Sequence, residues 1–207
     1  GTLLEETRAH IEQHHGRSLF QWVLRRFIIG QIFPFPWRLR LALLPVRVIR
    51  FLRLNFMLPK FAREMIELLP RSLVKSKLPI KRLARVGTKG QVGFVEGCVM
   101  QVMFGDTNES SVELLNRDGW DVYTPKGQGC CGALYAHSGQ LAKARDCARR
   151  NIVAFEKQPL DAIIINAAGC GATLVEYGEL LKNDPAWSER AKAFSGRVKD
   201  LVTWLEG

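Results

Sequence analysis

Residues Asp161–Ala172 read DAIIINAAGCGA, and they combine the clearest strand of the chain with a cysteine shortly after it. The alanine and three isoleucines at 162–165 form the near-continuous apolar centre that is typical of a parallel strand buried on both faces. The strand leads into Gly169-Cys170-Gly171, in which two glycines flank the thiol. The run therefore predicts a buried parallel strand with a cysteine just beyond its carboxyl end.

Two earlier segments repeat this arrangement. Residues 91–96 (QVGFVE) predict a short strand that leads into Gly97-Cys98, and residues 120–124 (WDVYT) predict a strand that precedes Gly129-Cys130-Cys131-Gly132. Apolar spacing predicts helices between and after the strands. These helices are expected over about 106–119, with Asn108 among the N-cap candidates, and over about 139–157, 172–182 and 185–204. Alternating strands and helices indicate an α/β fold, a Rossmann-like parallel sheet with βαβαβ order.

The carboxyl ends of parallel strands meet at one edge of a sheet, where open α/β sheets bind ligands. Four cysteines should therefore converge at that edge: Cys98, Cys130, Cys131 and Cys170. The fifth, Cys147, falls inside the 139–157 helix and is expected away from the edge, as a buried free thiol. His137 is expected to be a solvated residue with no ligand role, and no residue of this chain is assigned a catalytic role.

Thiolates favour soft metals, so four of them indicate a zinc or an iron–sulfur site. Structural zinc sites mostly use cysteine pairs separated by about two to four residues, and this sequence has no such pair. Adjacent cysteines fit a larger inorganic core better, although a redox-active Cys130–Cys131 disulfide is a further alternative. Glycine lets the backbone approach a cofactor closely. The expected cofactor-binding glycines are Gly97, Gly129, Gly132, Gly169 and Gly171.

The first 90 residues differ from the rest of the chain. Of the net charge of +10, they carry 18 Lys and Arg against 5 Asp and Glu, whereas residues 91–207 carry 12 against 15. Residues 18–69 mix arginines with aromatic and aliphatic side chains, and prolines divide them into short helices. Residues 2–15 predict another helix. We therefore expect a basic, apolar α-helical arm with a linker at 70–90, followed by the cysteine-rich domain at 91–207.

The arm has two possible roles. It packs on the rest of the protein, or its surface contacts an anionic membrane or an acidic partner subunit. In either case residues 18–69 should expose an unusually apolar surface. Nucleic acid is not an expected partner, because the arginines alternate with bulky aliphatic residues. The sequence shows neither a signal peptide nor an apolar run near the roughly 20 residues that span a membrane, which favours a cytoplasmic location.

The three cysteine segments resemble the cysteine-rich CCG domain. This family includes the B subunit of heterodisulfide reductase, lactate-utilisation iron–sulfur proteins and the iron–sulfur subunit of glycolate oxidase. The resemblance is strongest to the last of these, and residues 95–99, 148–152 and 166–172 carry it. It covers roughly residues 91–207 and, more loosely, the basic helical stretch before them. The family pattern ends in Cys-x-x-Cys, whereas this chain has Thr173 at the final position.

This resemblance implies a function. Cys98, Cys130, Cys131 and Cys170 would hold a [4Fe–4S] cluster. The chain would pass electrons towards quinone from an FAD-containing flavin subunit of a glycolate (2-hydroxy acid) dehydrogenase, at the inner face of the cytoplasmic membrane. Such subunits also have a ferredoxin domain and a second CCG domain, and this sequence shows the motifs of neither. We therefore interpret the chain as a middle fragment that contains the first CCG domain. The alternatives are a lactate-utilisation subunit and a zinc-binding or scaffold module without a redox role.

Overall fold

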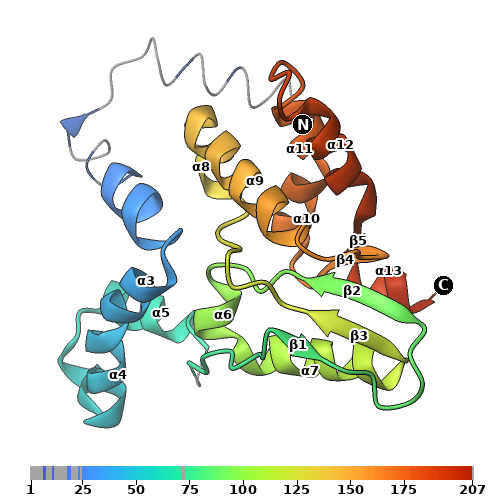
Figure 1. Ribbon diagram of the computed structural model, residues 1–207. Coiled ribbons are helices and arrows are strands. Elements are labelled where there is room, and N and C mark those ends of the chain that lie inside the picture. The colour runs from blue at the N-terminus through green and yellow to red at the C-terminus, as the bar shows by residue number, and fades with distance from the viewer. Residues whose placement is uncertain are drawn as a thin grey trace.

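The computed structural model describes residues 7, 11, 18–19, 23, 25–70 and 73–206, so the helix predicted over 2–15 lies almost entirely outside it. The described part contains a five-stranded sheet in the order β1-β3-β2-β4-β5 (Figure 1). Its strands are β1 (Lys81–Arg82), β2 (Gly90–Phe94), β3 (Trp120–Tyr123), β4 (Ala162–Ile165) and β5 (Val198–Asp200). All pairings are parallel except that of β1 with β3. The predicted α/β, Rossmann-like fold is confirmed.

Strand β2 lies next to both β3 and β4, and Val92 is in register with Val122 on one side and Ala162 on the other. The chain passes from β2 to β3 in one direction and then crosses to β4 on the opposite side of β2. The crevice outside the carboxyl ends of β2 and β4 is therefore the topological switch point, where sheets of this type bind ligands. The segments that follow β2, β3 and β4 are those that carry the cysteines.

Helices cover both faces of the sheet (Figure 1). On one face, α7 (Gly105–Arg117) and α13 (Leu201–Glu206) pack against a buried cluster that includes Val92, Phe94 and Ile164. On the other, α9 (Leu141–Phe155), α10 (Ala168–Val175), α11 (Tyr177–Leu180) and α12 (Ser188–Arg197) cover Ile163 and Ile165. Burial on both sides explains the unbroken apolar run of β4.

The structure corrects the predicted end of the chain. The single helix expected over 185–204 is wrong, because α12 ends at Arg197 and β5 precedes α13. The backbone turns extended at Val198, which is buried and pairs with Ile163 of β4. Helix α10 also begins earlier than expected, so Cys170 lies in its first turn. Two short helices were not predicted separately: α6 (Met100–Met103) and α8 (Ala133–His137).

The arm consists of short helices, as expected. They are the π-helix η1 (Arg25–Ile32), α3 (Pro36–Ala42), α4 (Leu44–Phe51), the 3-10 helix η2 (Leu54–Met57) and α5 (Lys60–Glu67). Pro36 and Pro45 lie in the first turns of α3 and α4, where a missing N–H group costs little. Leu39 and Leu43 pack against Val102 and Met103 next to the cysteine-rich part.

The segment expected as a linker makes backbone contacts with the sheet and with α6. Ser76 N donates to Gln101 O at 2.9 Å, and Thr124 N donates to Ile80 O at 2.7 Å. Strand β1 then pairs with β3 and completes one side of the sheet. Residues 73–90 therefore hold the arm against the remainder of the chain.

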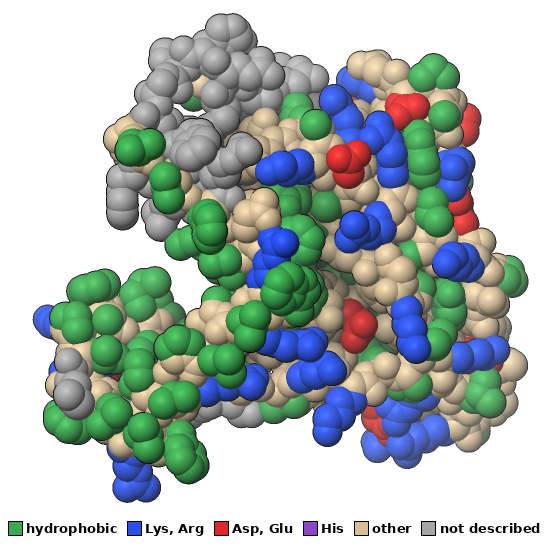
Figure 2. All heavy atoms as spheres, turned by 60° about the vertical axis from the view of Figure 1, so that its left-hand side comes forward, with side chains coloured by type: hydrophobic (Ala, Val, Ile, Leu, Met, Phe, Trp, Pro, Cys, Tyr) green, Lys and Arg blue, Asp and Glu red, His purple; other side chains and the backbone are tan. Residues whose placement is uncertain are grey.

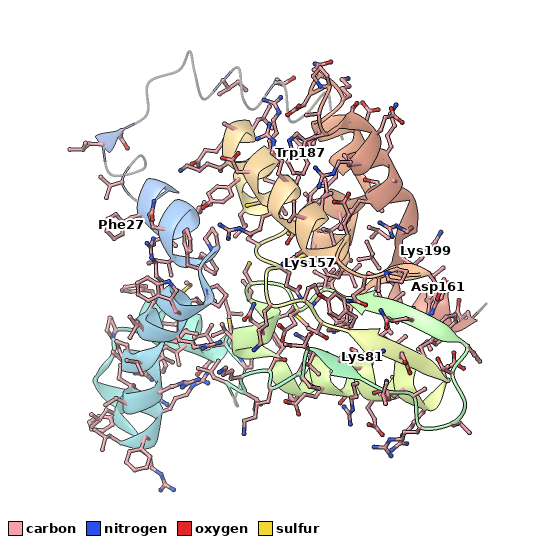
Figure 3. The ribbon with its side chains drawn as sticks, viewed as in Figure 1. Phe27, Lys81, Lys157, Asp161, Trp187 and Lys199 are labelled. Carbon is pink, nitrogen blue, oxygen red and sulfur yellow. The ribbon has the colours of Figure 1, made fainter. Side chains whose placement is uncertain are left out.

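The predicted apolar surface of the arm is present. Hydrophobic side chains gather over the lobe formed by α4, η2 and α5 (Figure 2), where Phe51 is 86% and Leu68 is 81% exposed. Phe27 also points away from the body (Figure 3). Two arginines of the arm form hydrogen bonds with backbone carbonyl groups. Arg50 donates to Ile66 O at 2.7 Å, and Arg47 donates to Leu73 O at 2.9 Å. Among the described residues, no helix combines the length and the apolar character needed to cross a bilayer.

Candidate metal centre

The four predicted cysteines meet at the carboxyl edge of the sheet. Cys98 follows β2, Cys130 and Cys131 follow β3, and Cys170 follows β4. The Sγ atoms of Cys98 and Cys130 are 3.6 Å apart, Cys131 is the next residue after Cys130, and Cys170 packs against the buried cluster that contains Cys131. The predicted convergence is confirmed, whereas the role of these cysteines as metal ligands stays a prediction. All five cysteines are free, so Cys130 and Cys131 are not joined as a disulfide.

The prediction that Cys147 lies away from this edge is wrong. A Cβ on Gly132, beside the cysteine pair, would lie 3.2 Å from Cys147 Cβ, and Cys147 lines one cavity together with Cys130. The reason is the path of the chain: α9 starts at the carboxyl edge, beyond β3, and returns to the start of β4 (Figure 1). Cys147 is in the first half of α9, three residues after Ala144 and four before Asn151, so the three share one side of the helix. That side faces the cysteine pair.

A tight turn places the vicinal pair. Gly132 has a φ of +91°, a conformation that residues with a Cβ rarely adopt, and its N–H donates to Cys130 Sγ at 3.4 Å. A Cβ on Gly132 would lie 3.2 Å from both Ala144 O and Cys147 Cβ. Helix α9 can therefore approach the turn this closely only because residue 132 is glycine. Gly97, beside Cys98, also has a positive φ, of +69°.

The other glycines predicted to bind a cofactor differ in their surroundings. A Cβ on Gly129 would lie 3.1 Å from Arg150 Cδ, and one on Gly171 would lie 3.2 Å from Ile165 Cγ2. A Cβ on Gly169 would meet no atom within 4 Å. At Gly129 and Gly171, neighbouring protein atoms already explain why the residue is glycine. At Gly169 no protein atom does, so a bound group is the explanation that remains for glycine at that position. The proposed approach of these backbones to a cofactor stays a prediction.

Asn151 and Tyr177, two buried residues that were not predicted from the sequence, form hydrogen bonds with the backbone of the cysteine pair and of Gly129. Gly129 N donates to Asn151 Oδ1 at 2.8 Å, and Asn151 Nδ2 donates to Cys130 O at 3.1 Å. The Tyr177 hydroxyl donates to Cys131 O at 2.7 Å and accepts from Asn151 Nδ2 at 2.9 Å. An asparagine on the buried side of a helix was the available signal, because a buried amide needs specific partners.

Amide side chains also join the loops that follow the three strands. Gln128 Oε1 accepts from Glu96 N at 2.9 Å, Asn108 Nδ2 donates to Glu96 O at 2.9 Å, and Asn166 Nδ2 donates to Asn108 Oδ1 at 3.0 Å. Asn108 was expected near the start of its helix as a capping residue, but α7 begins at Gly105 and Asn108 is fully buried. The loops are thus fixed to one another before any cofactor binds.

The thiols divide into proton donors and acceptors. Hydrogen bonds from Cys131, Cys147 and Cys98 lower the pKa of Cys130. The same contacts with Cys130, together with burial, raise the pKa values of Cys98, Cys131 and Cys147. A hydrogen bond from Cys131 lowers the pKa of Cys170. The thiolate form is therefore favoured at Cys130 and Cys170, and the thiolate is the form that binds metal.

The donor set fits an iron–sulfur core better than a single ion. Three cysteines lie around the pair Cys130–Cys131: Cys98 contacts Cys130, Cys147 lines a cavity together with Cys130, and Cys170 packs against the cluster that contains Cys131. In the part of the chain that the structure describes, no three Cys, His, Asp or Glu side chains are arranged to hold one metal ion. A cluster contains several irons, and thiolates are its usual ligands. His137 is exposed at the end of α8, as expected.

A cavity of about 240 Å³ lies between the arm and the cysteine edge. Cys130 and Cys147 line it from one side, and Gly30 and Phe35 line it from the arm. The Tyr135 hydroxyl donates to Gly30 O at 2.9 Å and so connects the two parts, and burial raises the pKa of Tyr135 to about 12. The arm therefore forms one wall beside two of the five thiols.

Comparisons with known proteins show which proteins the chain resembles. Residues 92–175 match the family model of the CCG cysteine-rich domain. The chain is 40% identical over 218 residues to a probable glycolate oxidase iron–sulfur subunit of Bacillus subtilis. This alignment covers 99% of this chain and 49% of the relative. The chain is 34% identical over 206 residues to the glycolate oxidase iron–sulfur subunit of Escherichia coli, covering 98% of this chain and 47% of the relative.

A more distant relative aligns with about half of the chain. Lactate utilization protein A of Geobacillus thermodenitrificans is 29% identical over 108 residues, covering 52% of this chain and 44% of the relative. The chain spans about half the length of the curated relatives it matches. No solved structure matches it.

Proposed function

We propose that the chain is part of the iron–sulfur electron-transfer subunit of a glycolate (2-hydroxy acid) dehydrogenase and that residues 92–175, which match the CCG family model, form its cysteine-rich domain. The observation that carries this proposal is the convergence of Cys98, Cys130, Cys131 and Cys170 from three segments at one edge. The names of the two relatives that align along nearly the whole chain support the glycolate assignment.

The residues at this edge suit a [4Fe–4S] cluster held by these four thiolates. When bound, the cluster supplies one-electron transfer. Cys98, Cys130 and Cys131 are almost fully buried and would keep water away from it. The Gly132 N–H, which already donates to Cys130 Sγ, would stabilise negative charge on that sulfur. Asn151 holds the loop in place, so little rearrangement would accompany electron transfer.

The partner in this proposal is an FAD-containing subunit that oxidises the 2-hydroxy acid. Electrons would pass through this chain towards quinone, and no residue of this chain would act as acid, base or nucleophile. The exposed apolar surface of α4, η2 and α5 supports contact with that subunit or with the inner face of the cytoplasmic membrane. We assign residues 1–90 to the arm and linker and 91–207 to a first CCG copy, within a longer protein that has a ferredoxin domain and a second copy.

A lactate-utilisation subunit is the second candidate, because Lactate utilization protein A aligns with half of the chain. The glycolate oxidase subunits align with nearly all of it, arm included, which favours the first candidate. Adding glycolate or lactate to the cluster-loaded protein in complex with its flavin subunit separates the two. The proposed substrate is the acid that bleaches the visible absorption of the cluster.

Anaerobic reconstitution of the chain with iron and sulfide tests the cofactor. We expect broad visible absorption together with bound iron and acid-labile sulfide. A chain that remains colourless and takes up zinc in place of iron would contradict the proposal and support the zinc-binding alternative. Cys170→Ser should lower the bound iron, because a hydroxyl is a harder and weaker ligand for such a core than a thiolate.

A further inference from the structure

We propose that Cys147, on helix α9, is a thiolate ligand of the cluster in addition to the four proposed above, so that the site supplies one thiolate more than a [4Fe–4S] core has irons. This inference rests on the proposed iron–sulfur function and extends it to a residue outside the CCG motif. Cys147 comes from the crossover helix, whereas the other four cysteines follow the carboxyl ends of strands.

Position is the first argument. Cys147 lines one cavity together with Cys130, whose sulfur also contacts Cys98, and a Cβ on Gly132 would lie 3.2 Å from Cys147 Cβ. The positive φ of Gly132 and the absence of a side chain there let α9 approach the pair closely. A ligand of Cys130 would therefore meet Cys147 without any movement of the backbone. Asn151, one turn further along α9, fixes the helix to the same loop through Gly129 N and Cys130 O.

Helix α10 supplies the second argument. Thr173 lies one turn after Cys170 and is buried, and its hydroxyl donates to Gly169 O at 3.4 Å within its own helix. That hydroxyl is engaged by the backbone and does not join the contacts among the thiols. α10 therefore contributes one sulfur, and the fifth sulfur at this edge comes from α9.

The third argument is space and charge. Cys147 is only partly buried, and it lines the cavity of about 240 Å³ together with Cys130. Lys143 and Arg150 line the same cavity, with Asp146 as the acidic residue among the lining side chains. Two cations beside two sulfurs would balance the negative charge that thiolates bring to a cluster. On binding, the Cys147 S–H bond is replaced by an S–Fe bond and the proton passes to solvent.

The opposing interpretation is that Cys147 packs as a small apolar residue against Tyr135, Ala136 and Ala144. Cys147→Ser and Cys147→Val separate the two, because serine keeps a weak donor atom and valine fills the space without one. In the anaerobically reconstituted chain, we expect the valine variant to lose bound iron to a chelator several-fold faster than the wild type. The serine variant should be intermediate, with an altered Mössbauer spectrum.

The matched control is Ala142→Val, which adds a β-branched side chain to an exposed position of the same helix. It should release iron at the wild-type rate. A packing role predicts instead that valine is tolerated at least as well as serine and that both variants keep the wild-type Mössbauer spectrum. That result would overturn the inference. Circular dichroism of each variant before reconstitution shows whether it has folded.

Thiol alkylation followed by mass spectrometry distinguishes failure of this inference from failure of the proposed function. Loading with iron and sulfide should slow the alkylation of Cys147 as strongly as that of Cys130, relative to the same chain treated with chelator. Protection of the other four cysteines with no change at Cys147 would overturn the inference and leave the iron–sulfur function standing. A chain that binds no iron would overturn both.

Discussion

Asn151 is the residue on which the shape of the cysteine pair most depends. Its amide satisfies a backbone N–H and a backbone C=O in the same loop and also contacts Tyr177. Each of these groups is buried, so losing a partner costs more than the bond itself contributes. The side chain therefore determines the geometry of the site without touching a cofactor.

Replacing this amide should weaken both the fold and the site. We expect Asn151→Ala to lower the free energy of unfolding by about 1–3 kcal/mol, because Gly129 N and Cys130 O lose their buried partner. Denaturant titration of the chain without iron measures this loss, and reconstitution should then give less bound iron. Val153→Ala, at a largely exposed position of α9, is the control and should change neither quantity.

Two glycines of the site should respond differently to the same substitution. Gly132→Ala places a Cβ at a φ of +91° and 3.2 Å from Ala144 O, so we expect a loss on the order of 1–3 kcal/mol and poor iron uptake. Gly169→Ala adds a Cβ in open space within α10, where alanine favours the helix by about 1 kcal/mol. It should leave the unfolding free energy equal or higher. If Gly169→Ala nevertheless lowers iron uptake, the backbone there approaches the cluster.

The elements of this fold differ in how much of them the sequence could predict. Strand β4 was predictable because both its faces are buried and its residues are therefore apolar throughout. Strand β5 has three residues, of which only Val198 is buried, so it leaves no pattern to recognise. The helix that carries Cys147 was predicted correctly, but the side of the helix facing the thiols was not. The sequence shows that Cys147 is spaced to share one side of the helix with Ala144 and Asn151. It does not show that this side of α9 packs over Gly132.

The helices of the arm expose many apolar side chains. If the protein lies at the inner face of the cytoplasmic membrane, as proposed, the arm should mediate the contact with the lipid. We expect the chain to sediment with anionic liposomes and the Phe51→Asp, Phe61→Asp double variant to do so several-fold less, because both rings are largely exposed. Val202→Asp, at an exposed position on α13, should behave like the wild type. Equal sedimentation of all three proteins would assign this surface to a protein partner.

At the scale of the whole molecule, the cofactor would join parts of the chain that are distant in sequence. Ligands that bind only the folded state add to its stability. We therefore expect chelation of the iron to lower Tm by several degrees, since each kcal/mol corresponds to about 2–4 °C in a chain of this size. Hydrogen exchange should quicken most in the loops after β2, β3 and β4. An unchanged Tm on complete iron removal would show that the cysteine edge is stable without its cofactor.

The amide contacts among those loops also bear on the order of assembly in the cell. Asn108, Asn166 and Gln128 join the cysteine segments through protein atoms alone. Their contacts connect residues far apart in sequence and can form only after β2, β3 and β4 are side by side, a slow step in folding. We therefore expect cofactor insertion to follow sheet formation, so that a delivery protein would meet a folded acceptor and not a nascent chain.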